Sequence, residues 1–351
     1  MEPALQRRLQ QLTQESVVHG SPGTILRVHV PAFRAGYAAA AGRFAQDEGR
    51  TLRPHDPFRV ASVTKTVTAA TVLRLAEVGA VALDEAIAEY LEPDLVARVH
   101  VIGGRSYADS ITLRHLLTHT SGIHDYFDKP FLAEVAAHPD RCWAPRELVE
   151  YAVTHGPPSF PPGEGFHYCD TGYVLAGLAV ERTTGSPLHE VYRALVLDPL
   201  DMDETYLEGH EPPRGSGVSH AYVDDVDVCE WNPTFDWAGG GLVSSAEDLS
   251  RLLRGLLGGR LLAEESVRTM TTWVPGASFA PPAVARYRRY GMGLGENVVE
   301  HARLVGHTGA WGAFMYHWVD RDVTVTGTVN RFALDRTPLL GGVVRLLAES
   351  F

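Results

Sequence analysis

Apolar positions along this chain repeat with two different periods, and the period depends on the region. Patterns of period two, typical of strands, lie near the two ends of the chain, at 24–30, 33–41, 312–319 and 323–329. Patterns of helical period predict helices at 3–18, 62–76, 113–117, 145–153, 172–182, 246–257 and 339–347. Loops rich in Pro and Gly separate the helices in the middle of the chain.

This order of elements predicts how the chain is divided. Strands at both ends imply that the two termini share one sheet, with the helical middle inserted between them. We therefore expect an α/β lobe formed by 1–78 and 290–351, in which helices flank an antiparallel sheet. An all-α lobe would consist of 79–289.

Composition excludes several classes of partner. The chain has 351 residues, of which 45% are hydrophobic and 21% charged, and a formal net charge of −12. This acidic balance argues against nucleic acid or an anionic membrane as a partner. No apolar run is long enough to span a membrane, and the polar N-terminal pattern lacks the apolar region of a signal peptide. Three scattered cysteines suggest a reducing compartment, so we expect a cytoplasmic protein. The patterns leave the oligomeric state open.

The lysines point to candidate chemistry. Of 31 basic residues only two are lysines, Lys65 and Lys129, so any role that needs only a positive charge could be filled by Arg. Lys65 follows Ser62 by three residues at the start of a predicted helix, which places hydroxyl and amine on the same face. The positive end of the helix dipole and burial both disfavour an ammonium there. Lys65 could therefore accept the proton of Ser62.

Two further segments complete a recognisable series of motifs. Tyr168 and Asp170 follow a Pro- and Gly-rich loop, just before the helix predicted at 172–182, and a His-Thr-Gly sequence begins at His307. In this order, Ser-x-x-Lys, Tyr-x-Asp and His-Thr-Gly resemble the serine β-lactamase and penicillin-binding superfamily. The closer resemblance is to its branch of class C β-lactamases, D-Ala-D-Ala carboxypeptidases and esterases. The stretches at 116–123 and 239–245 also resemble this branch, and the resemblance covers about 58–330.

The resemblance implies a β-lactamase/transpeptidase-like fold and a role for each matching residue. Ser62 would be the acylated nucleophile and Lys65 its activating neighbour. Tyr168, as a phenolate held by Lys65, would shuttle protons in both half-reactions. The backbone N–H groups of Ser62 and Ala310 would form the oxyanion hole. Substrate would contact Asp170, His307, Thr308, Gly309 and Trp311.

Two of these residues differ from the most familiar pattern of the branch. Asp170 stands where Asn is usual, and an ionised carboxylate can only accept hydrogen bonds. His307 replaces Lys and is mostly neutral at pH 7, so it would attract a substrate carboxylate less. These differences, with no signal peptide expected, make β-lactamase and DD-carboxypeptidase activities less favoured predictions.

The prediction that follows is hydrolysis of a small ester or amide through an acyl-enzyme, without metal or cofactor. The alternative is an acyltransferase in a cytoplasmic biosynthetic pathway that passes the acyl group to an alcohol or amine, with Asp170 attracting the amine. A penicillin-binding-like sensor that does not turn over is a third hypothesis, which the intact Ser62, Lys65 and Tyr168 argue against.

Other residues have simpler interpretations. His115 and His119 are four residues apart, as zinc ligands on a helix can be, but no Glu completes an H-E-x-x-H sequence, so no metal is predicted. Cys169 is expected to be a small buried side chain next to Tyr168.

Overall fold

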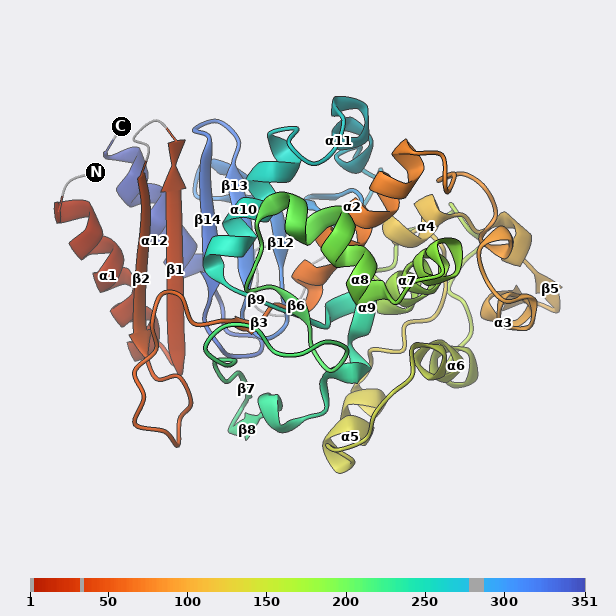
Figure 1. The fold of residues 1–351 in the computed structure, drawn as a ribbon, viewed down its shortest axis with the longest axis horizontal. Coiled ribbons are helices and arrows are strands. Elements are labelled where there is room, and N and C mark those ends of the chain that lie inside the picture. Colours follow the sequence, from red (N-terminus) through yellow and green to blue (C-terminus); the bar gives the residue numbers. More distant parts are fainter. Residues whose placement is uncertain (1–2, 32–34, 278–286, 351) are drawn as a thin grey trace.

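The computed structural model describes residues 3–31, 35–277 and 287–350, and its largest sheet joins the two ends of the chain (Figure 1). Seven antiparallel strands follow the order β10-β11-β12-β13-β14-β1-β2. The N-terminal pair is β1 (Gly23–Val30) and β2 (Ala35–Gly42), and β1 pairs with β14 with Ile25 opposite Thr328. The C-terminal strands are β10 (Arg289–Tyr290), β11 (Gly295–Val299), β12 (Ala302–Thr308), β13 (Phe314–Trp318) and β14 (Val323–Thr328).

Helices cover both faces of this sheet. On one face lie α1 (Pro3–Val18) and α12 (Thr337–Ala348), which share an apolar core with Leu26, Val28 and Val30 of β1. The intervening Ile25 points to the other face and belongs to the main core, as the alternation of a strand requires. On that second face α10 (Ala246–Leu257) packs against β1, β13 and β14. Although α10 falls in the range predicted for the helical lobe, its apolar stripe is buried on the sheet.

The helical part of the molecule is arranged around α2 (Thr64–Glu77) and α7 (Asp170–Thr184), which contact each other and α9 (Trp237–Gly240). The other helices are α3 (Pro93–Val99), α4 (Leu113–Leu117), α5 (Lys129–Ala137), α6 (Pro145–His155), α8 (Leu188–Tyr192) and α11 (Glu264–Met270). A small sheet contains β3 (Phe58–Arg59), β9 (Leu242–Ser244) and β6 (Tyr206–Leu207). Two short hairpins pair β4 (Val101–Ile102) with β5 (Arg105–Ser106), and β7 (Tyr222–Val223) with β8 (Val226–Asp227).

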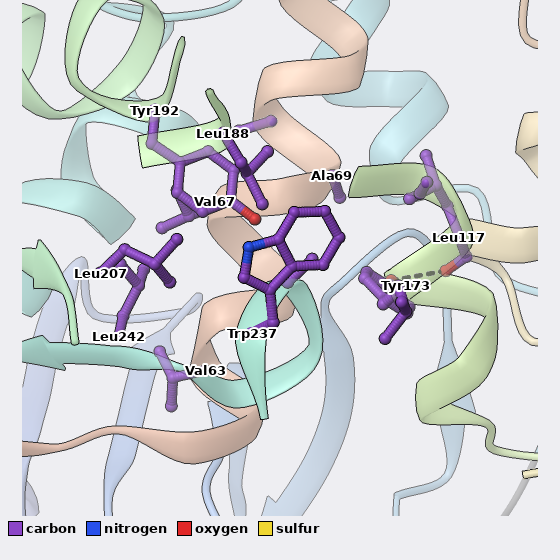
Figure 2. Close-up of a cluster of buried hydrophobic side chains, with 14 of the residues drawn as sticks. Val63, Val67, Ala69, Leu117, Tyr173, Leu188, Tyr192, Leu207, Trp237 and Leu242 are labelled. Carbon is purple, nitrogen blue, oxygen red and sulfur yellow. Dashed lines mark hydrogen bonds between the residues drawn. The ribbon is translucent and has the colours of Figure 1, made fainter. Parts of the chain in front are cut away.

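A buried indole fixes α2 against its neighbours. Trp237 is inserted among side chains from α2, α8, β6 and β9 (Figure 2). Beside it, the Thr68 hydroxyl of α2 donates a hydrogen bond to the carbonyl of Ala238 at 2.7 Å. On the α7 side, the Tyr173 hydroxyl donates to the Leu117 carbonyl at 2.7 Å. Apolar packing and satisfied polar groups therefore hold α2 on several sides.

The predicted elements and the observed ones agree closely, with some differences at element ends. The helices predicted at 113–117 and 246–257 have those bounds, whereas α6 and α7 are longer than predicted. Residues 33–34 of one predicted strand lie outside the described residues. Within the described part of the chain, no helix is both long enough and apolar enough to cross a membrane.

Candidate active site

The periodicity predicts Ser62 inside a helix, but Ser62 lies in a tight turn just before α2. Residues Ala61–Val63 form one turn of 3₁₀ helix, and α2 begins at Thr64. The preceding Ala61 has φ = +44°, a left-handed conformation that costs energy for a residue with a Cβ. This turn leaves the Ser62 side chain partly exposed while Val63 and Thr64 are buried.

Lys65 is buried beneath Ser62, and three groups surround its amine. Its side chain is 0% exposed, and Nζ lies 3.0 Å from Ser62 Oγ. Nζ also donates to the carbonyl of Gly239 at 2.8 Å and forms an ion pair with the Asp170 carboxylate. A Cβ on Gly239 would approach Asp170 Oδ1 to 2.9 Å, so a glycine lets this backbone come close to the ion pair. The predicted proximity of Ser62 and Lys65 is present.

Asp170 faces Lys65 and is only 5% exposed. Its position at the start of α7 is fixed by Asp125, whose Oδ1 accepts the N–H of Asp170 at 2.8 Å. Burial and the Asp170 carboxylate raise the pKa of Asp125 to about 7. The carboxylate of Asp170 is thus engaged within the protein, which removes the basis for expecting it to attract an amine acceptor.

Tyr168 completes the polar group around Ser62. The Ser62 side chain acts to lower the pKa of the Tyr168 hydroxyl, and the ring centroid of Tyr168 lies 5.0 Å from Lys65 Nζ. Burial, reinforced by the negative charge of Asp170, raises the pKa of Tyr168 well above its usual range. The resting hydroxyl is therefore protonated, in contrast to the phenolate expected from the resemblance.

The strand side of the site is formed by β12 and the turn that follows it. Thr308 is the last residue of β12, Gly309 packs against the backbone of Val60, and Ala310 is half-buried. A Cβ on Gly309 would lie 2.1 Å from the carbonyl oxygen of Val60, so only glycine permits this approach. The contact brings the turn that carries Ala310 next to the Ser62 turn.

His307 and Trp311 are less accessible than substrate-binding residues were expected to be. The His307 Nδ1–H donates to the Thr308 carbonyl at 2.7 Å, so Nε2 accepts from the Tyr290 hydroxyl at 2.8 Å. Burial and the nearby Lys65 lower the pKa of His307 to about 3, which leaves the ring neutral. Trp311 is 2% exposed and packs edge-to-face against Trp231 and Phe235. Substrate contact by either side chain stays a prediction.

Sequence patterns did not single out Arg336, which lies just before α12 and supports the same turn. Its side chain is buried, and it donates through Nε to the Gly312 carbonyl at 3.0 Å and through Nη2 to the Gly309 carbonyl at 2.8 Å. These two carbonyls bracket Ala310. Arg336 therefore fixes the turn whose backbone N–H was predicted to bind the oxyanion.

The alternative chemistries weighed for other residues find no support in the geometry. His115 Nδ1 accepts the N–H of Thr112, and His119 Nδ1 accepts that of Cys169, so the two Nδ1 atoms serve separate hydrogen bonds. In the described ranges, no group of three or more His, Cys, Asp or Glu side chains could hold a metal ion. Burial raises the pKa of the Cys169 thiol well above its usual value, which disfavours the reactive thiolate.

Comparison with known proteins identifies the family and the fold. The family model described as Beta-lactamase matches residues 32–348. A solved structure of a D-stereospecific amidohydrolase from Streptomyces sp. superposes with a TM-score of 0.80 at 30% identity, covering 95% of this chain and 97% of that one. A penicillin-binding protein of Bacillus subtilis is 25% identical over 317 residues, which cover 84% of this chain and 65% of that protein. Esterase EstB of Burkholderia gladioli is 34% identical over 187 residues, or 51% of this chain and 45% of that protein.

The chain therefore belongs to the beta-lactamase family, and the predictions of a β-lactamase/transpeptidase-like fold and of a serine enzyme of this family are confirmed. It spans less than two thirds of the length of the two curated relatives just described.

Proposed function

We propose that this chain hydrolyses a small amide or ester through an acyl-enzyme on Ser62. The observation that supports this function most strongly is the 3.0 Å separation of Lys65 Nζ and Ser62 Oγ, with the lysine wholly buried. A nucleophile and its base within hydrogen-bond reach, oriented by a third group, are what covalent catalysis needs. Here the third group is Asp170.

The contacts suggest a route for the proton. In the neutral form of Lys65, the two N–H groups donate to the Asp170 carboxylate and the Gly239 carbonyl, which leaves the amine lone pair available to Ser62. As Ser62 Oγ forms its bond to the substrate carbonyl carbon, Lys65 takes the hydroxyl proton. The Tyr168 hydroxyl gives its proton to the leaving nitrogen or oxygen as that bond breaks, and Lys65 then reprotonates Tyr168. Water repeats the sequence in reverse and releases the acid.

The turn after β12 supplies the remaining element of the proposed mechanism. The N–H groups of Ser62 and Ala310 would bind the oxygen that becomes negative in the tetrahedral intermediate. Burial keeps Tyr168 protonated, which suits a group that must act as an acid toward an amine leaving group. Amides are proposed beside esters for this reason, and the likeness to the D-stereospecific amidohydrolase supports the same choice.

The test is turnover and covalent labelling with a panel of D-amino acid amides, simple esters and β-lactams. We expect at least one amide or ester to be hydrolysed, with an acyl adduct on Ser62 detected by intact-protein and peptide mass spectrometry. Ser62→Ala should abolish both, because removal of the nucleophile of a catalytic unit costs about 10⁶-fold in rate. Cys142→Ala is the matched control, since it removes an exposed nucleophile elsewhere. An adduct that persists in Ser62→Ala would refute the proposal.

A further inference from the structure

His119 contacts the segment that carries Tyr168 at three points. Its backbone carbonyl accepts the N–H of His167 at 2.9 Å, and its ring Nδ1 accepts the N–H of Cys169 at 3.1 Å. Between these two bonds, the imidazole ring lies against the Tyr168 ring, with centroids 4.2 Å apart and planes inclined by 34°. The residues on both sides of Tyr168 and the phenol ring itself are thus held by one residue.

The backbone of His119 is in an unusual conformation that makes these contacts possible. It follows α4 with φ = +59°, in the left-handed region where helices often end on glycine. A residue with a side chain costs about 1–3 kcal/mol when held in a sparsely populated region. The side chain therefore contributes something at this position that glycine would not.

The hydrogen bonds define the protonation state of the ring. Because Nδ1 accepts a hydrogen bond, the proton of the neutral imidazole is on Nε2. Within the described residues Nε2 has no hydrogen-bond partner, although the ring is only 1% exposed. Leaving a buried donor unpaired costs about 1–3 kcal/mol. The orientation of the ring thus provides the hydrogen bond to Nδ1 and the contact with Tyr168, and it leaves Nε2 without a partner.

Charge reinforces this neutral state. Burial is the main cause that lowers the pKa of His119 well below its usual value, and the positive charge of Lys65 acts in the same direction. A protonated ring would lose the acceptor for Cys169 and would place a second cation near the amine. His119 therefore stays neutral at pH values near 7.

We propose that His119 is a positioning residue that holds Tyr168 at hydrogen-bond distance from Ser62 and shields its hydroxyl from water. This inference rests on the proposed function, because His119 acts only through Tyr168, which that function makes the proton donor to the leaving group. Two properties of the side chain are needed: an acceptor for the N–H of Cys169, and a flat ring against the phenol.

Two substitutions separate these properties. His119→Asn keeps an acceptor near the place of Nδ1 and tolerates positive φ, but it removes the ring. His119→Phe keeps a ring but leaves the N–H of Cys169 without its acceptor. The matched control is His115→Asn. Nδ1 of His115 also accepts a backbone N–H, but this N–H belongs to Thr112 and not to the segment that carries Tyr168. Thermal unfolding of each variant is measured alongside activity.

We expect His119→Phe to lower kcat by about 100-fold, the cost of misplacing a catalytic group by about 1 Å. KM should change little, because Tyr168 transfers protons and is not assigned to substrate binding. His119→Asn should retain more activity than His119→Phe, and His115→Asn should match the parent. Equal kcat in His119→Phe and the parent would overturn the proposal.

The pH profile separates positioning from general packing. Removing the ring in His119→Asn admits water next to Tyr168, which reduces the desolvation that raises the pKa of the phenol. That pKa then falls, and activity that needs the protonated hydroxyl is lost at lower pH, so the alkaline limb moves toward neutrality. In His119→Phe the limb should stay in place. The other charged and titratable groups that face Tyr168 are unchanged in both variants: Lys65, Asp170, Asp125, Tyr173, Tyr287, Tyr290 and His307. An unmoved limb in His119→Asn would contradict the shielding role.

A double-mutant comparison distinguishes failure of this inference from failure of the proposed function. If Tyr168→Phe alone leaves turnover normal, the assigned role of Tyr168 is wrong. If Tyr168→Phe is inactive but His119→Phe is normal, only the positioning role is wrong. If both roles are correct, each single variant loses activity. Adding His119→Phe to Tyr168→Phe should then cause no further loss, since the two residues act as one unit. A further large loss would show that His119 acts independently.

If the His119 variants do not fold, the parent protein still provides a test. Nitrogen-15 NMR of the imidazole reports directly which ring nitrogen carries a proton. We expect His119 to show a bare Nδ1 and a protonated Nε2, unchanged from pH 8 down to pH 5. A doubly protonated ring in that range would overturn the proposal.

Discussion

Two fully buried cations support this site from opposite sides, and their surroundings differ in kind. Lys65, on the helix side, faces a hydroxyl, a carbonyl and a carboxylate, from Ser62, Gly239 and Asp170. Arg336, on the strand side, donates to two carbonyls and forms no ion pair with a carboxylate in the described residues. Burial lowers the pKa of Arg336 only to about 10, so its guanidinium remains charged.

The difference teaches what each cation does. A planar guanidinium with several fixed donors is suited to bridging two carbonyls, and it keeps its protons. An amine beside a serine hydroxyl can instead take up the proton of Ser62 and pass it on to Tyr168. The Arg336 region is thus a support for the oxyanion turn, whereas the Lys65 region is where protons move. Substituting these residues tests the contrast.

The largest effect is expected from Lys65→Arg. A guanidinium is too large for the three-sided space around Nζ and does not release its proton near neutral pH. Turnover of an ester or amide should fall by about 10³-fold, close to the loss in Lys65→Ala, because general base catalysis is removed in both. The matched control is Lys129→Arg, at the exposed start of α5, which should leave turnover unchanged. Near-normal turnover in Lys65→Arg would mean that only positive charge is needed.

A smaller loss is expected from Arg336→Lys. The single ammonium cannot bridge the carbonyls of Gly309 and Gly312 as the guanidinium does, so the turn that carries Ala310 loses part of its support. We expect kcat to fall by about 10²-fold with KM little changed, similar to the removal of one oxyanion donor. Arg345→Lys serves as the control because Arg345, on α12, forms an exposed ion pair with Glu300, and such pairs contribute little. Equal losses in both variants would remove the distinction between the two cations.

This contrast also explains which parts of the molecule could be predicted from sequence. Periodicity located the terminal strands β1, β2, β13 and β14 and most of the longer helices, since it depends on local burial, but it predicted none of α3, α5, α8 and α11. It predicted no strand at β11, where Glu296 and Asn297 are buried polar residues. Lys65 was recognisable because lysine is rare in this chain. Arg336 is one of many arginines, and only the folded turn beside it shows its role.

The Ser62 turn and His119 show the same limit. The helix start was placed too early because Ala61–Val63 form a 3₁₀ turn, in which the left-handed Ala61 lies beside Gly309, almost 250 residues away in sequence. His119 lies in a stretch that resembles the family, but its contacts with the Tyr168 segment are made across 50 residues of chain. Motifs therefore identified the reacting groups, and long-range contacts identified the groups that hold them.

The smallest expected change in activity, and the most informative for the Lys65 region, is that of Asp170→Asn. The amide keeps a hydrogen-bond acceptor for Lys65 but removes the counter-charge, which should lower turnover by about tenfold. Removing one partner of a buried ion pair should also lower the free energy of unfolding by about 3 kcal/mol, measured by urea denaturation.

The pH dependence gives the sharper readout for Asp170→Asn. The negative charge of Asp170 disfavours the Tyr168 phenolate and so raises the pKa of Tyr168. Without that charge the pKa falls, the protonated hydroxyl is lost at lower pH, and the alkaline limb of the rate profile moves toward neutrality. Asp201→Asn is the control, because Asp201 forms an exposed ion pair with Arg260 and should affect neither the limb nor stability. A limb that stays in place, or moves to higher pH, would show that the charge of Asp170 does not act on Tyr168.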